Sequence, residues 1–280
     1  MNKKILTILL FIASSLSFSY SETDVKKLKF TGICENCDFS GVNFFDYDFW
    51  TEPSKYFLTP PGAAKAPFYI DLTNKILNGS NFKGANLSNV SLYGSMLEGT
   101  NFEEANLSGA NLNRASLKEA NFKNANLSGA SLDYVRTKNT NFTFANLSNS
   151  NYEEHNPDGN QYVGAQVNAI FKNANLTNIK TQRFNLKGLD LREANFTGTN
   201  LVNANLKDAD LTGAVFRNAN ISGARVRNAN FTAVDLSQTM MQKVSFNLAI
   251  LCGTIMPWGK EDSGCTKIEK PKTDMDDFDL

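Results

Sequence analysis

The sequence is poor in the residues that most enzymes use for chemistry. Its 280 residues include a single histidine, His155, and two tryptophans. It contains no His-x-x-x-His pair, no Gly-x-Ser-x-Gly elbow and no glycine-rich phosphate loop, so the usual zinc, nucleophilic and nucleotide chemistries lack support. The acidic pairs Glu103-Glu104 and Glu153-Glu154 are expected on the surface, where no buried site forms for acid–base work. We therefore expect a protein that is not an enzyme and holds no cofactor or metal.

The chain also has no formal net charge at neutral pH. Basic and acidic residues both number 28, which balances the chain at neutral pH. Nucleic-acid binders are usually strongly basic, and proteins that imitate a nucleic acid are strongly acidic. The balance therefore argues against nucleic acid as a partner.

Long apolar runs are absent except at the start of the chain. Two lysines precede the apolar segment 5–16, and small serines follow as far as Ser21. This order is typical of a secretory signal peptide, and the run is shorter than the about 20 residues of a membrane-spanning helix. We predict a signal peptide over residues 1–21, cleaved after Ser21 or Ser19. The mature protein is then periplasmic or extracellular, with no transmembrane segment.

What the sequence has in abundance is a repeat. Ala-Asn-Leu-Ser stands at 85–88 and recurs at steps of 20 as far as 145–148, while a large apolar residue returns every five positions. Helices have a period of 3.6 and strands a period of 2, so neither produces this pattern. Self-similarity at about 20 residues indicates a solenoid. If each five-residue unit forms one side of a square coil, like residues stack inside one wall; the clearest such set is Phe82, Phe102, Phe122 and Phe142.

The unit Ala-(Asp/Asn)-Leu-x-x resembles the pentapeptide-repeat family. The resemblance implies an all-β fold, a right-handed quadrilateral parallel β-helix of about nine coils with short terminal caps. The segment 34–41 is similar to the Cys-x-x-Cys-Asp-Leu-Ser-Gly entry of many members, with Phe39 in place of leucine. The segment 252–265 is similar to the Cys-x-Thr-x-Met-Pro…Ser-Gly-Cys closure of some members.

The four cysteines fall into two pairs at the two ends of this solenoid. Nine coils at about 4.8 Å each separate the pairs by roughly 40 Å, whereas a disulfide tolerates at most about 7 Å between Cα atoms. An exported protein meets an oxidising environment. We therefore predict two local disulfides, Cys252–Cys265 and the tighter ring Cys34–Cys37.

Residues 22–33 are expected to cap the first coil, because an open β-coil end exposes unpaired backbone groups. A short helix beginning near Thr23 or Asp24 would present Val25, Leu28 and Phe30 for packing.

Interruptions of the five-residue repeat divide the rest of the chain. The solenoid is predicted over 34–256, with looped-out insertions at 51–68 and 153–168 where prolines interrupt the repeat. Phe171 follows Tyr152 by 19 residues, so the second insertion either extrudes a loop or rotates the second block on the first. A disulfide-tied cap at 257–265 follows, in which we expect Trp258 to cover the last coil. The remaining residues, 266–280, form an acidic tail that is expected to be disordered.

Outward positions suggest candidate binding surfaces. The Asn columns are expected to satisfy one another as amide ladders, although a flat wall of amides and hydroxyls also suits a periodic glycan or ice lattice. A basic stripe contains Lys187, Lys207 and Arg227, which would suit a polyanion such as lipid headgroups or nucleic acid. Asp208 stands beside this stripe, so a solvated face of mixed charge is the alternative interpretation. A possible interface anchor combines Tyr93, Arg114 and Tyr134.

These observations favour an exported, non-enzymatic, rigid scaffold whose flat faces meet a protein or envelope partner. The family resemblance implies one alternative, a DNA mimic that binds type II topoisomerases. Another alternative is an accessory protein that binds a ligand through the inserted loops 51–68 and 153–168. The identity of the partner and the oligomeric state stay open.

Overall fold

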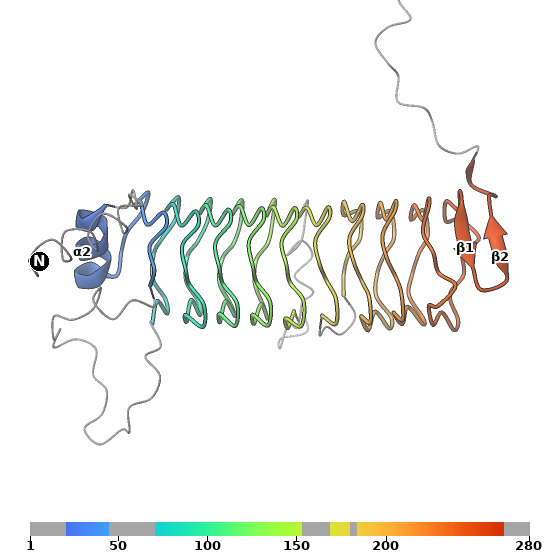
Figure 1. The fold of residues 1–280 in the computed structure, drawn as a ribbon, viewed down its shortest axis with the longest axis horizontal. Helices are drawn as coiled ribbons and strands as arrows, with labels where there is room; N and C mark the ends of the chain where they lie inside the picture. The colour runs from blue at the N-terminus through green and yellow to red at the C-terminus, as the bar shows by residue number, and fades with distance from the viewer. Residues whose placement is uncertain (1–20, 45–70, 153–168, 180–183, 266–280) are drawn as a thin grey trace, which may run out of the picture.

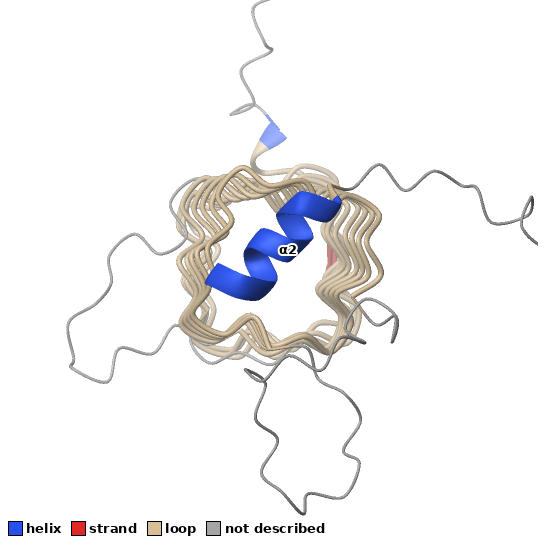
Figure 2. Ribbon diagram, turned by 90° about the vertical axis from the view of Figure 1, so that its left-hand side faces the viewer, coloured by secondary structure: helices blue, strands red, loops and turns tan. Residues whose placement is uncertain are grey.

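The chain folds into a straight rod of stacked coils with a helix at one end and a hairpin at the other (Figure 1). The computed structural model describes residues 21–44, 71–152, 169–179 and 184–265. Viewed along its axis, the rod has a square outline (Figure 2). The all-β interpretation is therefore right for the coils.

Each coil takes 20 residues, and each residue lies above its counterpart in the coil before. Parallel bridges join Asn81 to Asn101 and Asn101 to Asn121, and the same step of 20 is repeated on the other sides. We number the four walls by the bridge residues that they share in the first block: wall 1 with Asn81, Asn101 and Asn121; wall 2 with Asn86, Asn106 and Asn126; wall 3 with Ser91, Asn111 and Ser131; wall 4 with Met96, Ser116 and Arg136.

The interior is filled by columns of leucine and phenylalanine. Behind wall 1 the rings of Phe102 and Phe122 stack with centroids 4.8 Å apart and planes 10° apart, as the repeat predicts. These side chains have no exposed surface, and full burial of each contributes about 1.5–3 kcal/mol. The column continues to Phe82 on one side and to Phe142 on the other, at 5.2 Å in both cases.

The second inward position of each unit takes small residues, including hydroxyl residues that need a hydrogen-bond partner. The buried Ser95 donates to the carbonyl of Leu72 at 2.6 Å, and Thr199 donates to that of Leu176 at 2.8 Å. Both acceptors lie 23 residues earlier, in the preceding coil. A serine or threonine therefore fits this core position without leaving a polar group unsatisfied.

Helix α2, Glu22–Thr31, lies across the open end of the first coils (Figure 2). Ser21 caps it by accepting a hydrogen bond from the backbone N–H of Asp24 at 3.2 Å. Leu28 is buried and Val25 packs against the core. The expectation for Phe30 is wrong: its side chain is 71% exposed, because residues two apart on a helix point to nearly opposite sides.

The last coil ends in the hairpin of β1, Thr254–Met256, and β2, Gly259–Glu261. β1 continues wall 2, because Ile255 bridges Asp235 in parallel, and β2 pairs with the outer edge of β1. Trp258 does not cover the coil as expected. It lies in the two-residue turn, 66% exposed, and its indole N–H donates to the Glu261 carboxylate at 3.1 Å.

Both insertions leave the columns in line. Across the first, Ile33 bridges Ile76, a separation of 43 residues instead of 20. Across the second, Asn141 bridges Ile170, and Phe171 stacks on Phe142 at 4.8 Å. The second block is thus not rotated on the first, and paired residues across the junction are 29 apart, nine more than in a regular coil. The predicted insertions 51–68 and 153–168, the predicted signal peptide 1–21 apart from Ser21, and the tail 266–280 lie outside the described residues.

Candidate functional site

Wall 2 carries amide ladders that are satisfied internally. The side-chain N–H of Asn106 donates to the Asn86 side-chain oxygen at 3.2 Å, and that of Asn126 donates to Asn106 at 3.1 Å. The Asn106 oxygen also accepts the backbone N–H of Ser108 at 3.2 Å. Each amide oxygen is thus used twice within the protein, which favours the structural explanation of this column over a ligand-binding one.

The predicted aromatic–arginine cluster is brought together on the corner between walls 3 and 4. The guanidinium carbon of Arg114 lies 5.9 Å from the ring centroid of Tyr93 and 5.7 Å from that of Tyr134. Such contacts are worth about 0.5–1 kcal/mol at exposed sites. The arginine is therefore held between two rings, and its role in binding stays a prediction.

The predicted basic stripe is also brought together, on wall 4. The backbone N–H of Gly188 donates to the Lys207 carbonyl at 2.8 Å, and that of Asp208 donates to the Arg227 carbonyl at 3.0 Å. Lys187, Lys207 and Arg227 therefore hold the same position in three successive coils. Lys187 and Arg227 are exposed and Lys207 is half-buried.

Sequence reasoning missed the extension of this stripe into the first block. Lys118 and Lys138 hold the same position of wall 4 in two successive coils there, since the N–H of Glu119 donates to the Lys138 carbonyl at 2.9 Å. Lys138 and Lys187 are 49 residues apart. Because 49 is not a multiple of 20, the sequence repeat does not reveal that they share a wall. That relation becomes visible only when the length of the insertion is known.

Wall 1 is charged as well, and acidic residues stand among its bases. Arg192 donates to the Asp190 carboxylate at 2.8 and 2.6 Å, and these hydrogen bonds hold the pKa of Asp190 below its usual range. Lys83 lies 3.5 Å from the Glu103 carboxylate. The Glu103-Glu104 pair is therefore a surface feature, as expected. His155 and the pair Glu153-Glu154 lie outside the described residues.

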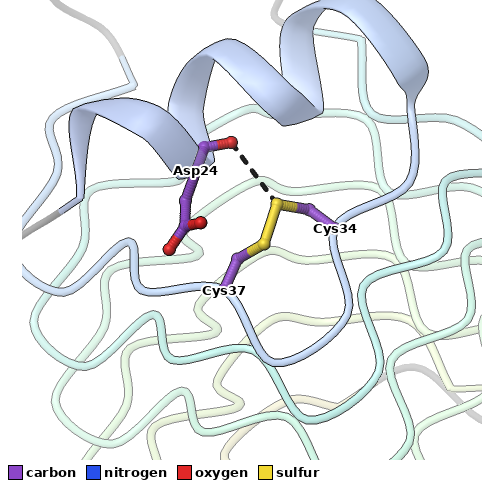
Figure 3. Close-up of side chains that lie close together, drawn as sticks. All are labelled: Asp24, Cys34 and Cys37. Carbon is purple, nitrogen blue, oxygen red and sulfur yellow. Dashed lines mark hydrogen bonds between the residues drawn. A yellow bond between two sulfur atoms is a disulfide. The ribbon is translucent and has the colours of Figure 1, made fainter.

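Both predicted disulfides are present, and each has an aspartate beside it. Figure 3 shows the Cys34–Cys37 bond below α2, with the Cys34 sulfur 3.3 Å from the carbonyl oxygen of Asp24. Asp262 lies beside Cys252–Cys265. The sulfurs within each pair are bonded to each other, so neither group offers thiolate ligands to a metal in this form. Within the described part of the chain, no helix combines the length and apolar character that a membrane crossing needs.

Stacked five-residue units, four to a coil, define this chain as a repeat solenoid with a square outline. The model of the family described as pentapeptide repeats matches it in 8 copies, over residues 70–103, 100–136, 169–208, 194–232 and 209–247. These segments together span more than half of the chain. The chain belongs to the pentapeptide-repeat family, whose members are generally non-enzymatic structural or interaction proteins.

Solved structures of other pentapeptide-repeat proteins resemble this chain. HetL of Nostoc sp. strain PCC 7120, involved in regulation of heterocyst differentiation, is 20% identical over 81% of this chain and 90% of its own, with a TM-score of 0.32. QnrB1, a plasmid-mediated fluoroquinolone resistance protein, is 21% identical over 62% of this chain and 83% of its own, with a TM-score of 0.40.

A pentapeptide-repeat protein from the thylakoid lumen of Arabidopsis thaliana is 34% identical over 31% of this chain and 59% of its own, with a TM-score of 0.29. No curated protein matches the chain.

Proposed function

We propose that this protein is an exported, non-enzymatic, rigid scaffold that presents its flat walls to a protein or envelope partner. The observation that carries the proposal is the filled interior: Phe102, Phe122 and Leu107 have no exposed surface, and each coil rests on the next. Side chains rather than a cavity occupy the axis of the rod. A partner would therefore bind to the outer walls.

Export is supported by the signal-like start of the sequence and by the two disulfides, which persist in oxidising compartments. Fractionation of cells that express the full chain tests it. We expect the processed protein in the periplasmic or extracellular fraction. Recovery of the unprocessed chain in the cytoplasm would contradict the proposal.

The partner is best sought by crosslinking in intact cells followed by mass spectrometry. A scaffold should give crosslinks from one or two walls, because a flat partner meets one side of a square rod at a time. Crosslinks spread evenly over all four walls would mean that no wall is specialised.

The topoisomerase-binding alternative is not supported by the charges on the walls. A DNA mimic has to present acidic residues along its length, whereas wall 4 of this chain presents Lys187, Lys207 and Arg227 in line. We expect the purified protein to leave the supercoiling activity of DNA gyrase unchanged. The loop-mediated alternative concerns 51–68 and 153–168, which lie outside the described residues, so it stays a prediction.

We further propose that the coils are right-handed and number about nine between the caps. The family resemblance and the uninterrupted wall 1 column from Asp38 to Ile250 support this geometry. An experimental density map would reveal both hand and coil number, and left-handed coils would contradict it.

A further inference from the structure

We infer that wall 4 binds a linear acidic polysaccharide that carries one carboxylate on each sugar. The inference deepens the proposed function, and it rests on export because such polymers belong to capsules, walls and matrices outside the cytoplasm. The observations that carry it are the alignment of the bases, their lack of partners and the flatness of the wall.

The bases of wall 4 are aligned in two parallel columns. One column contains Lys118 and Lys138 in successive coils of the first block and Lys187, Lys207 and Arg227 in successive coils of the second; the wall 4 position of the coil between Lys138 and Lys187 lies outside the described residues. The other column, two residues earlier in each unit, contains Arg136 and Arg225, with the uncharged Asn185 and Asn205 in the two coils before Arg225. Successive coils are about 4.8 Å apart, so within each block the positive charges of the first column repeat at nearly the advance of one sugar ring in a 1,4-linked chain.

Acidic residues do not balance this wall. Between 116–139 and 185–228, wall 4 carries seven basic residues and two acidic ones, Glu119 and Asp208. Two further acids of this wall, Glu35 and Glu98, lie in the coils before Lys118, where Glu98 accepts a hydrogen bond from Ser116 at 2.9 Å. Glu119 pairs with Lys118 at 3.6 Å, and Asp208 accepts a hydrogen bond from Asn228 at 3.0 Å. Among the described residues, none forms an ion pair with the six remaining bases, which are Arg136, Lys138, Lys187, Lys207, Arg225 and Arg227.

Unpaired charges of one sign in a column repel one another, and a bound polyanion removes that repulsion. Wall 1 shows the contrast. There acids stand among the bases, and Lys83 and Arg192 pair with Glu103 and Asp190, although none of the ion pairs of the described residues includes Lys123 or Lys172. Wall 4 thus differs from wall 1 in the excess of bases over acids along its basic coils.

The shape of the wall selects among polyanions. A flat side of a straight rod favours an extended ligand that follows the coil axis. Phosphates on one strand of duplex DNA repeat at about 3.4 Å, which does not match the coil spacing. Membrane surfaces favour bases flanked by apolar anchors, but the exposed apolar residues of wall 4, Ile33, Met96 and Leu248, lie outside the basic coils. A one-carboxylate-per-sugar chain fits best.

The test uses the purified chain and polymannuronate, a 1,4-linked polymer with a carboxylate on every sugar. Hyaluronan, with a carboxylate on every second sugar, tests the dependence on carboxylate spacing. Cello-oligosaccharide, which has no charge, tests the dependence on charge. We expect polymannuronate to bind at least tenfold more tightly than hyaluronan at equal salt. The triple variant Lys187→Gln, Lys207→Gln, Arg227→Gln should bind polymannuronate roughly a hundredfold more weakly, since each base near an anionic surface contributes about a factor of five.

The matched control removes three lysines from the same unit position of wall 1: Lys83→Gln, Lys123→Gln and Lys172→Gln. It loses the same net charge and should bind polymannuronate as the unmodified chain does, with both variants checked for folding by circular dichroism. Equal losses in the two variants would overturn the inference, as would tighter binding to oligothymidylate or to phosphatidylglycerol vesicles than to polymannuronate. Because binding is measured with purified protein, its failure leaves the fractionation result for export intact.

Discussion

At the scale of single residues, the two inward positions of the first block that are neither leucine nor phenylalanine contact each other. Thr137 and Tyr152 are both buried, and their hydroxyl oxygens lie 3.1 Å apart. The tyrosine ring also contacts Phe184 across the second insertion, with centroids 5.0 Å apart. The repeat marks both positions as exceptions, but the contact between residues 15 apart depends on the closing of the coil.

Removing one hydroxyl of this pair should lower the stability of the protein more than removing both. Tyr152→Phe removes this hydrogen bond from the buried Thr137 hydroxyl, which costs up to about 1–3 kcal/mol, whereas apolar replacement of both hydroxyls is nearer to neutral. We expect the double variant Tyr152→Phe with Thr137→Val to unfold at a higher urea concentration than Tyr152→Phe alone. A double variant less stable than either single variant would show that the hydroxyls do not act as a pair.

At the scale of elements, the two caps are held by local chemistry. The backbone N–H of Ser21 donates to the Asp38 carbonyl at 3.2 Å, while its side chain caps α2. Loss of a serine cap typically costs about 1 kcal/mol. Cleavage after Ser21 would remove this residue, and cleavage after Ser19 would keep it.

We therefore expect the exported protein to begin at Tyr20. Mass spectrometry of the secreted chain measures this directly. The variant Ser21→Ala should in addition speed hydrogen exchange in α2, with Lys26→Ala, at an exposed position of the same helix, as the control. A mature chain that begins at Glu22 would rule out a cap supplied by Ser21.

The C-terminal cap depends on a close approach at Gly264. Its N–H donates to the Leu251 carbonyl at 2.8 Å, and a Cβ at this position would collide with the backbone of Ile250 and Leu251. Backbone atoms cannot move aside as a flexible side chain does. The glycine therefore lets residues 259–265 lie against the last coil beside the Cys252–Cys265 bond.

Gly264→Ala should loosen this cap while the disulfide still forms. We expect faster hydrogen exchange and faster proteolysis within 252–265 and little change in the coils before residue 230. The neighbouring substitution Ser263→Ala, at an exposed position, should leave both rates unchanged. Equal protection in the two variants would contradict the role given to the glycine.

At the scale of the whole molecule, each coil contacts only the coils before and after it. Stability in such a solenoid is approximately a sum of terms for each repeat and each interface. The rings of Phe82, Phe102 and Phe122 illustrate this, since each stacks on its neighbour at 4.8–5.2 Å. A defect in one coil should therefore stay local.

Phe102→Ala should cost about 3–5 kcal/mol, because the neighbouring rings cannot close the cavity. Hydrogen exchange should accelerate in the coils of Phe82 and Phe122 and remain slow near Phe216, several coils away. Leu211→Ala, an equally buried position in the second block, serves as the reciprocal control. Uniform acceleration along the rod would mean that the molecule unfolds as one cooperative unit.

The sequence alone determined the coil, because the steps of 5 and 20 residues state which side chains face inward and which ones stack. It also placed the cysteine pairs, Lys187 above Lys207, and Tyr93 near Arg114, since these follow from the step within a block. The tertiary structure decided how the caps dock and which residues meet across the insertions, because the repeat step does not extend to these segments. The exposure of Phe30 and Trp258 depends on how the caps dock, and the junction of Phe142 with Phe171 depends on where the inserted chain re-enters. That junction also puts Lys138 and Lys187 on the same wall, two coils apart. Contacts across an insertion depend on space rather than on sequence separation, and only the folded chain defines them.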